Sequence, residues 1–427
     1  MTPPPLPGTL SELEVWPPDR LAAWQADRVR EILEYARSRS SFYRERWAAA
    51  GAASEDVASL ADLERLPVVS KRDLLAAGEE WLASGQGPVG FSTRGTSGEP
   101  LVLWMDPPES EAYIVPTVRG FRWAGVGPGT TALLLSPAWH RLAAMEGHAV
   151  VRLGGRAAYF WGTLGGSEHV DAFLEAMEEV RPGFVTSTPP FLLNAVRRLD
   201  ETGQDAQALF AGVAAVSLVG LPLTPQLQEL LRARLGVPHV FERGGTQEGA
   251  ALDECELHTT PHVHADVCHL EVLDAGGRPV SPGTRGRLVV TKLVAGGSPF
   301  VRYDTGDIAA FEPGPCPCGR TLPRLRIFGR GESSVLVGGR LVTAYDVRRC
   351  VDEDPDLVGR VVLLVRGSEP SEGVRVAVEG RPGDEAGLVG RLRERLEIES
   401  ADILWLGDTR IFWGLRQVID EAELKGR

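Results

Sequence analysis

Phe184-Val185-Thr186-Ser187 begins the stretch of sequence that decides the fold. This β-rich run is followed by a helical pattern over Pro190–Asp200 and by a second strand pattern over Val213–Leu218. A helix over Pro225–Leu235 and a strand over Val237–Phe241 complete the series. Strands that alternate with helices in this way predict a parallel α/β core, in which ligands bind at the carboxyl ends of the strands.

Outside this stretch the pattern changes toward the C-terminus. One long helix is expected over Ala22–Ala50, whereas the region His262–Phe311 is mostly β. After Gly329-Arg330-Gly331 the remaining residues predict a small α+β unit. We therefore expect an α/β protein with a large N-terminal α/β domain, residues 1–330, that includes a β-rich subdomain, and a small C-terminal α+β domain, residues 331–427.

Composition excludes several classes of protein. A content of 43% hydrophobic and 24% charged residues is typical of a globular protein, and no apolar run approaches the roughly 18 residues of a membrane helix. The first residues are neither basic nor followed by an apolar core, so we expect no secretory signal and a cytoplasmic enzyme. A net charge of −13 argues against a nucleic-acid binder, and five cysteines are too few for a disulfide scaffold.

A loop rich in small hydroxyl residues lies in Phe91-Ser92-Thr93-Arg94-Gly95-Thr96-Ser97-Gly98. Glycines free the backbone to wrap a phosphate with its N–H groups. Taken alone the loop is weak evidence, because such loops are more often plain turns. It is not a Walker loop, since no Gly-Lys-Ser/Thr follows.

Two acidic motifs follow. In Gly244-Gly245-Thr246-Gln247-Glu248 an acid at the carboxyl end of a strand could bind Mg²⁺ or lie beside a phosphate. In Val301-Arg302-Tyr303-Asp304-Thr305-Gly306-Asp307 the last carboxylate could accept hydrogen bonds from both hydroxyls of a ribose. The alternatives are a solvated loop acid for Glu248 and a type I turn with Asp307 at its tip.

Cysteines and a histidine form a candidate metal site. Cys255, His262, Cys316 and Cys318 come from two separate loops, and three thiolates with one imidazole satisfy tetrahedral Zn²⁺. Four protein ligands leave no open position, so the metal would be structural. The alternative is a set of buried free thiols.

The order of these motifs resembles that of adenylate-forming enzymes. A hydroxyl-rich loop, a Gly-Gly-x-x-Glu turn, a Tyr-x-Thr-Gly-Asp turn and a Gly-Arg at a domain boundary follow one another. Ser41-Phe42-Tyr43-Arg44-Glu45-Arg46 and Leu63-Glu64-Arg65-Leu66-Pro67 resemble the N-terminal signature of phenylacetate–CoA ligases. Cys316-Pro317-Cys318-Gly319-Arg320 and Gly329-Arg330 are similar to the segment that joins the two domains in that branch.

The resemblance implies a role for each matching residue. It implies that the ATP phosphates and the rest of the nucleotide are bound by Ser92, Thr93, Gly95, Thr96, Ser97, Gly98, Gly220, Leu221, Pro222, Gly244 and Gly245. Glu248 would lie at Mg²⁺ and the α-phosphate, Asp307 at the ribose, and Arg330 beside it at the hinge. Glu332 would be the hinge acid about which a mobile small domain swings, and Gly339 would line the pantetheine tunnel for coenzyme A. The branch also carries a structural metal at positions that correspond to the four candidate ligands.

The chain departs from the family pattern at three places. Glu99 replaces a lysine that is often found in the phosphate loop, and Gln247 stands where Ser or Thr is common. The segment Phe412–Asp420 lacks the expected lysine after glycine, a residue that neutralises charge at the α-phosphate during adenylation. Arg416 and Lys425 are candidate replacements, although neither is at the matching position.

Aromatic residues suggest the acid. The family's acyl pocket would be formed by Trp139, His140, Tyr159, Phe160 and Trp161, although aromatic side chains are ordinarily core. We therefore expect an aryl-acid–CoA ligase that uses ATP, Mg²⁺ and coenzyme A with an aromatic carboxylic acid. The alternatives are an acyltransferase that moves an aryl group from acyl-CoA to an acyl carrier protein, and a nucleotide-binding protein without turnover. The oligomeric state stays open, with a homodimer as one option.

Overall fold

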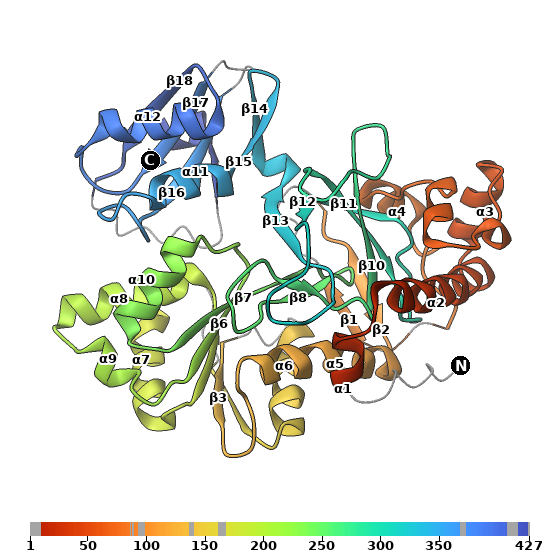
Figure 1. The fold of residues 1–427 in the computed structure, drawn as a ribbon, viewed down its shortest axis with the longest axis horizontal. Coiled ribbons are helices and arrows are strands. Elements are labelled where there is room, and N and C mark those ends of the chain that lie inside the picture. The colour runs from red at the N-terminus through yellow and green to blue at the C-terminus, as the bar shows by residue number, and fades with distance from the viewer. Residues whose placement is uncertain are drawn as a thin grey trace. The chain divides into compact units, whose positions relative to one another are not determined.

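The computed structural model describes residues 10–85, 87, 89–92, 99–135, 141–160, 168–367, 373–407 and 417–425. The chain divides into two compact units, coloured along the sequence in Figure 1. The first unit contains Met1–Gly129, Ala138–Arg156 and Arg243–Ile327. The second contains Thr130–Pro137, Ala157–Glu242 and Phe328–Arg427.

The long N-terminal helix expected from the sequence is two helices, so that prediction is wrong in detail. Helix α2 (Pro18–Arg39) ends before Ser40, and α3 (Ser41–Ala49) begins directly after it. Ser40 has an extended backbone, its hydroxyl accepts a hydrogen bond from the N–H of Tyr43, and it donates to the carbonyl of Glu80 at 2.9 Å. A serine that caps a helix satisfies one of the N–H groups that lack a partner in the first turn, and this favours a break.

The rest of the first unit is built from short helices around an antiparallel sheet. The helices are α1 (Leu10–Glu14), η1 (Ser54–Asp56), η2 (Leu60–Arg65), α4 (Lys71–Ala77), α5 (Pro107–Trp123) and α6 (Arg141–Arg152). The strands are β1 (Val89–Ser92), β2 (Val102–Met105), β10 (Cys268–Leu273), β11 (Gly286–Lys292), β12 (Tyr303–Phe311) and β13 (Leu325–Arg330), the last of which continues into the second unit. Strands β1 and β2 form a hairpin, and the others form a sheet in the order β10-β11-β12-β13, which confirms the expected β-rich part.

The second unit contains the parallel core that the sequence predicts. Its strands are β3 (Thr131–Leu134), β4 (Arg156–Tyr159), β5 (Phe184–Ser187), β6 (Ala215–Val219) and β7 (His239–Gly245), in the order β4-β3-β5-β6-β7. Its helices here are α7 (Glu168–Val180), α8 (Pro189–Thr202), α9 (Ala206–Leu209) and α10 (Pro225–Leu235). Strand β5 pairs in parallel with β3 and with β6, and the α/β fold class is thus confirmed.

Apolar faces hold this core together. Helices α7, α8 and α10 lie beside the sheet that contains β6 (Figure 1). Their buried side chains form one continuous cluster with those of β5 and β6. The final residues of β7, from Arg243 to Gly245, belong to the first unit. There they pair with β8 (Ala251–Asp253), which in turn pairs with β9 (His262–Val263).

The C-terminal residues of the second unit form their own small sheets. The elements are β14 (Ser334–Val337), β15 (Arg340–Thr343), α11 (Ala344–Asp352), β16 (Val362–Arg366), β17 (Gly373–Val378), α12 (Glu385–Leu396), β18 (Ser400–Trp405), β19 (Val418–Asp420), α13 (Glu421–Lys425) and the turn η3 (Gly331–Ser333). The larger sheet has the order β18-β17-β16-β19. Among the described residues, its two hydrophobic clusters contain side chains from this part of the chain alone.

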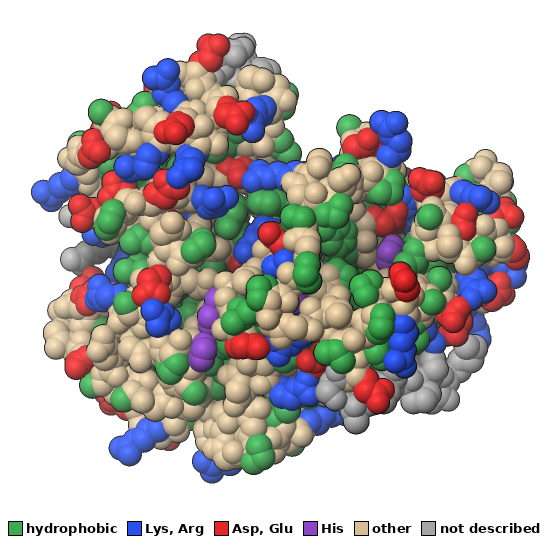
Figure 2. All heavy atoms as spheres, viewed as in Figure 1, with side chains coloured by type: hydrophobic (Ala, Val, Ile, Leu, Met, Phe, Trp, Pro, Cys, Tyr) green, Lys and Arg blue, Asp and Glu red, His purple; other side chains and the backbone are tan. Residues whose placement is uncertain are grey.

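Charged side chains of both signs lie on the surface (Figure 2). Acidic and basic side chains are intermingled over the described residues on the face shown in Figure 2. Of the helices that the structure describes, none has both the length and the apolar character that are needed to cross a membrane.

Candidate active site

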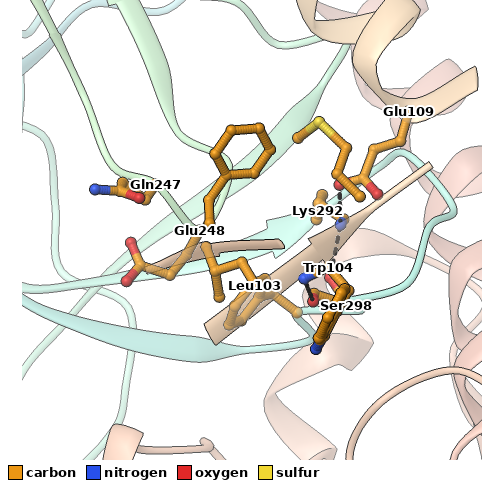
Figure 3. Close-up of a pocket in the computed structure, with 10 residues that line it drawn as sticks. Leu103, Trp104, Glu109, Gln247, Glu248, Lys292 and Ser298 are labelled. Atoms are coloured by element: carbon orange, nitrogen blue, oxygen red, sulfur yellow. Dashed lines mark hydrogen bonds and ion pairs between the residues drawn. The ribbon is translucent and has the colours of Figure 1, made fainter. Parts of the chain in front are cut away.

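Glu248 lies in a tight turn that follows strand β7. Gly245 has a φ of +142°, and a Cβ placed there would lie 2.3 Å from the carbonyl oxygen of Ala250. Thr246 donates its backbone N–H to that same carbonyl at 3.0 Å, which closes the turn. The glycine is therefore required by a close backbone approach, and it holds Glu248, which is buried at 7% exposure. Gln247 and Glu248 both line the pocket drawn in Figure 3.

A buried polar network fixes the strand residue that precedes this turn. Arg243 donates to Glu146 at 2.9 Å and to Thr117 at 2.8 Å, and it pairs with Asp253. Asp253 accepts from Nε2 of His264 at 2.8 Å. Burial lowers the pKa of His264, so its neutral ring donates at Nε2. The end of β7 is therefore held by several strong hydrogen bonds.

The same histidine joins a second ion pair. Nδ1 of His264 accepts from Arg119 at 2.9 Å, and Arg119 forms a bidentate pair with Asp266 at 2.9 and 2.8 Å. Burial alone would raise the pKa of Asp266, but the Arg119 guanidinium outweighs this effect and holds that pKa below its usual value. His264 is thus a structural residue, and it lies outside the candidate metal group.

Asp307 lies in a bulge of strand β12 rather than at the tip of a free turn. Arg287 pairs with Ile308 and Val289 pairs with Asp304, so three residues of β12 stand opposite Leu288 alone. Gly306 has a φ of +77° within this bulge. A bulge re-aims a side chain while the strand stays anchored on both sides. Asp307 is 6% exposed and donates its N–H to the Thr305 hydroxyl at 3.1 Å.

The expected phosphate loop is only partly within the described residues. Ser92 is exposed at the end of β1 and pairs with Val102 of β2. Thr93, Gly95, Thr96, Ser97 and Gly98 lie outside the described residues, and their role stays a prediction. The hairpin β1–β2 nevertheless brackets the loop on both sides.

Several expected site residues belong to the second unit. Gly220, with a φ of +102°, lies with Leu221 and Pro222 directly beyond the carboxyl end of β6. The next residue, Leu223, donates its N–H to Glu242 at 3.1 Å. Ligands commonly bind at the carboxyl ends of parallel strands in α/β folds. These residues therefore lie at a suitable position for the nucleotide contact that the sequence predicts, and that role stays a prediction.

The expected hinge and tunnel residues follow β13. Arg330 is exposed at the end of that strand, and its carbonyl accepts from the Ser334 hydroxyl at 2.8 Å. Glu332 is exposed in the short turn η3. Gly339 has a φ of +77° in the turn between β14 and β15. All three are accessible, as residues that contact a ligand or a moving domain would be.

The aromatic residues expected at an acyl pocket are incompletely described. Trp139, His140 and Trp161 lie outside the described residues. Tyr159 is 42% exposed at the end of β4. Phe160 packs edge-on against Phe173, with ring centroids 6.0 Å apart, and so contributes to the core of the second unit. The pocket assignment for these residues stays a prediction.

The four candidate metal ligands come together. The ligand atoms of Cys255, His262, Cys316 and Cys318 all lie within 4.8 Å of one another. Sγ of Cys255 lies 3.8 Å from Sγ of Cys316, and Sγ of Cys318 lies 3.5 Å from Nε2 of His262. Thiolates about 2.3 Å from a tetrahedral zinc ion would lie about 3.8 Å apart, so the spacing fits this metal.

The chemistry of the donors also fits a metal. Nδ1 of His262 donates to the carbonyl of Leu322 at 3.1 Å, which leaves Nε2 directed at the cysteines. Burial lowers the pKa of His262 to about 4, so its ring is neutral, the form that binds metals. Burial raises the pKa of Cys255 to about 12. A bound cation would be needed to hold this thiol as a thiolate.

Sequence reasoning missed the charged pair in the pocket beside Glu248. Lys292, at the end of β11, donates to Glu109 of α5 at 2.7 Å and to the carbonyl of Ser298 at 2.6 Å (Figure 3). Both charged side chains are 3% exposed. The signal that could have found it is the rarity of lysine, since Lys71, Lys292 and Lys425 are the only three in the sequence.

The chain is similar to several known proteins. The AMP-binding enzyme family matches residues 109–294. A phenylacetate–coenzyme A ligase of Aromatoleum evansii is 24% identical over 416 residues, which cover 92% of this chain and 90% of that protein. A phenylacetate–coenzyme A ligase of Thermus thermophilus is 26% identical over 392 residues, 86% of this chain and 83% of that protein. The structure of a 2-hydroxyisobutyryl-CoA ligase in the postadenylation state with 2-HIB-AMP superposes with a TM-score of 0.84 at 20% identity, over 97% of this chain and 92% of that one.

The fold is that of adenylate-forming CoA ligases, and residues 109–294 match the AMP-binding enzyme family. The chain is similar to phenylacetate–CoA ligases over most of its length, and the resemblance predicted from the sequence is confirmed.

Proposed function

We propose that this chain is an aryl-acid–CoA ligase. A carboxylate and ATP would give an acyl-adenylate and pyrophosphate, and the thiol of coenzyme A would then displace AMP. The observation that carries the proposal is the pair of buried carboxylates, Glu248 in its glycine turn and Asp307 in its strand bulge. They occur in a chain that matches phenylacetate–coenzyme A ligases over most of its length.

Each site residue then has a chemical task. Asp307 would accept hydrogen bonds from the ribose hydroxyls, for which a carboxylate with two oxygens is suited. Glu248, with Mg²⁺, would lie at the α-phosphate, where charge develops as pyrophosphate leaves. Ser92 and the loop after it would bind the phosphates, while Gly220 to Pro222 would flank adenine. Binding energy would orient the acid and the nucleotide for attack.

The aromatic substrate rests on two supports. The relatives in Aromatoleum evansii and Thermus thermophilus are named for phenylacetate. The sequence places Trp139, His140, Tyr159, Phe160 and Trp161 where the resemblance expects the acyl pocket. We propose a flat aryl or arylacetic acid, which would suit such walls.

We further propose a structural Zn²⁺ ion and a mobile C-terminal domain. Cys255, His262, Cys316 and Cys318 would hold the metal, as their spacing supports. Residues 331–427 would move as a small domain about Arg330 and Glu332, with Gly339 lining the coenzyme A path. Two hydrophobic clusters that contain only residues from Val335 to Leu424 support this domain boundary, although residues 328–427 share a compact unit with the parallel core.

Pyrophosphate release tests the proposal directly. Purified protein with Mg·ATP, coenzyme A and a panel of aryl, arylacetic and short aliphatic acids should release pyrophosphate in step with acyl-CoA, fastest with an aromatic acid. If pyrophosphate release were fastest with an aliphatic acid, the ligase reaction would be supported but the aromatic substrate would be refuted. A lack of release with the whole panel would refute the ligase.

One feature of the sequence favours a second candidate. The segment Phe412–Asp420 lacks the lysine that assists adenylation, and transfer of an acyl group from acyl-CoA to a carrier protein would not need it. Most of this segment lies outside the described residues. Mass spectrometry of a carrier protein incubated with aryl-CoA and this chain would detect the added acyl mass.

A further inference from the structure

Lys292 is an unusual residue for its position. The chain has 45 lysines and arginines together, but only three of these are lysines. One of the three is buried at 3% side-chain exposure, in the pocket that Gln247 and Glu248 line. A buried charge is costly unless it is paired and hydrogen-bonded. Solubility therefore does not explain why a lysine occupies this buried position.

The ammonium of Lys292 joins two segments of the first unit. It donates to Oε1 of Glu109, in the first turn of α5, and to the carbonyl of Ser298. The backbone N–H of Lys292 also donates to the carbonyl of Phe300 at 2.8 Å. These two bonds to Ser298 and Phe300 close residues 293–300 into a loop. The ammonium links this loop to Glu109 of α5, as the dashed lines in Figure 3 show.

The stem of Lys292 supports the turn that carries Glu248. Gly249, the residue after Glu248, has a φ of +132°. A Cβ placed on it would lie 2.7 Å from the Tyr113 hydroxyl and 3.3 Å from Cγ of Lys292. The backbone of the turn at Gly249 therefore packs directly against the aliphatic part of Lys292 and against the Tyr113 hydroxyl.

The loop around the ammonium also contacts the hairpin of the expected phosphate loop. The hydroxyl of Ser298 accepts from the backbone N–H of Trp104 in β2 at 2.7 Å. Trp104 pairs with Gly90, and the hairpin continues to the pair of Ser92 with Val102, where the phosphate loop begins. A single ammonium thus lies between the Glu248 turn and this hairpin.

We propose that Lys292 is a positioning residue for Mg·ATP. Its ion pair with Glu109 fixes the distance between the Glu248 turn and the β1–β2 hairpin, so that both reach the phosphates of one nucleotide. This inference rests on the proposed function. A compact ammonium with three N–H groups suits the role better than a planar guanidinium, which presents a wider fork. A role in stability alone is a weak explanation, because buried ion pairs often add little net stability.

Variants that remove the ammonium test the proposal. Lys292→Met alone removes the ammonium from beside the buried carboxylate of Glu109, and this variant could fail to fold. The double variant Lys292→Met with Glu109→Gln removes both charges and keeps similar volumes. Lys71→Met is the matched control, because it makes the same change at the start of α4, away from the pocket.

The readout is the affinity for Mg·ATP compared with that for adenosine, measured by titration calorimetry. Adenosine lacks the phosphates that the two segments would share. In the double variant we expect Mg·ATP to bind at least about tenfold more weakly, while adenosine affinity stays unchanged. ATP–pyrophosphate exchange should show a raised KM for Mg·ATP. Lys71→Met should match the wild type in every measurement.

Other outcomes separate the two proposals. An unchanged ratio of the two affinities, with or without a lower melting temperature, would give Lys292 a purely structural role and overturn the inference while the ligase stands. Equal weakening of both ligands would also overturn it. If the wild type binds neither nucleotide nor adenosine, the proposed function fails and this inference fails with it.

Discussion

At the scale of single residues, backbone geometry fixes the two acids that we propose to bind the nucleotide. Asp307 lies within a bulge whose flanking residues remain paired with β11, so its carboxylate is held by a strand on both sides. Glu248 follows Gly245, whose backbone conformation few other residues adopt. A side chain held on rigid backbone loses less entropy when a ligand binds.

Asp307→Ala should weaken AMP and ATP binding. Loss of a charged hydrogen bond costs about 1.5–3 kcal/mol, which corresponds to roughly 10- to 150-fold in the dissociation constant. Titration calorimetry of the folded variant measures this. Asp274→Ala, in the turn after β10, is the control and should bind as the wild type does. Unchanged affinity in Asp307→Ala would contradict the ribose assignment.

Removal of one metal ligand is a second test at this scale. Purified wild-type protein should contain about one equivalent of zinc, and Cys316→Ser should lower both the zinc content and the melting temperature. Cys350→Ser is the control for loss of a buried thiol, since Cys350 is buried in the C-terminal core and lies outside the cluster. The zinc content of the Cys350→Ser variant should equal that of the wild type. If wild-type protein without metal were as stable as wild-type protein with zinc, the metal site would be contradicted.

At the scale of elements, an ion pair within the second unit ties helix α8 to the C-terminal sheets. Glu379 is 3% exposed and follows β17. It accepts from Arg197 of α8 at 3.0 and 2.5 Å and from the backbone N–H of Val361 at 2.9 Å. Gly359 also lies close to α10, because a Cβ there would meet Leu230 at 2.7 Å. These contacts join the parallel core to the C-terminal residues.

Glu379→Ala should therefore lower the free energy of unfolding by about 1–3 kcal/mol, because the Val361 N–H and Arg197 lose their acceptor. Urea denaturation measures this. A double-mutant cycle with Arg197→Ala should give a coupling energy of about 0.5 kcal/mol or more. Arg198→Ala on the same helix removes an exposed pair with Asp171 and should change stability by less than about 0.5 kcal/mol. If Arg197→Ala and Arg198→Ala lowered the free energy of unfolding equally, the stabilising role of the Arg197–Glu379 ion pair would be contradicted.

At the scale of the whole molecule, the two half-reactions make different demands on charge. Adenylation concentrates negative charge at the α-phosphate, where one positioned cation lowers the barrier by a few kcal/mol. Exchange at the acyl carbon does not develop that charge. The sequence lacks the expected lysine between Phe412 and Asp420. Adenylation should therefore be slowed more than the reaction at the acyl carbon.

We predict slow ATP–pyrophosphate exchange in the wild type and faster use of a preformed acyl-adenylate or acyl-CoA. Leu415→Lys, or Gly414→Lys if the register differs by one, should raise the exchange rate at least about tenfold, roughly 1.4 kcal/mol. Radioactive pyrophosphate exchange measures this. Brisk exchange in the wild type that is lost in Arg416→Ala or Lys425→Ala would show that another cation serves, and would favour the ligase over the acyltransferase.

The sequence by itself determined the elements whose pattern is local. Strand β5 and helix α10 have the bounds that periodicity predicts, because apolar spacing and flanking prolines are properties of consecutive residues. The motif order likewise indicated the class of enzyme before any contact was known. The break at Ser40 was missed, because the choice between a helical and a capping serine depends on its contact with distant Glu80.

Only the tertiary structure decided which distant residues meet. It brought Cys255 and His262 together with the loop of Cys316 and Cys318, as the sequence had proposed, and placed Asp307 in a bulge rather than a turn. It also paired Lys292 with Glu109, 183 positions apart, for which no local pattern exists. Burial and pairing of charges arise when elements pack, and a sequence read residue by residue carries no distances between them.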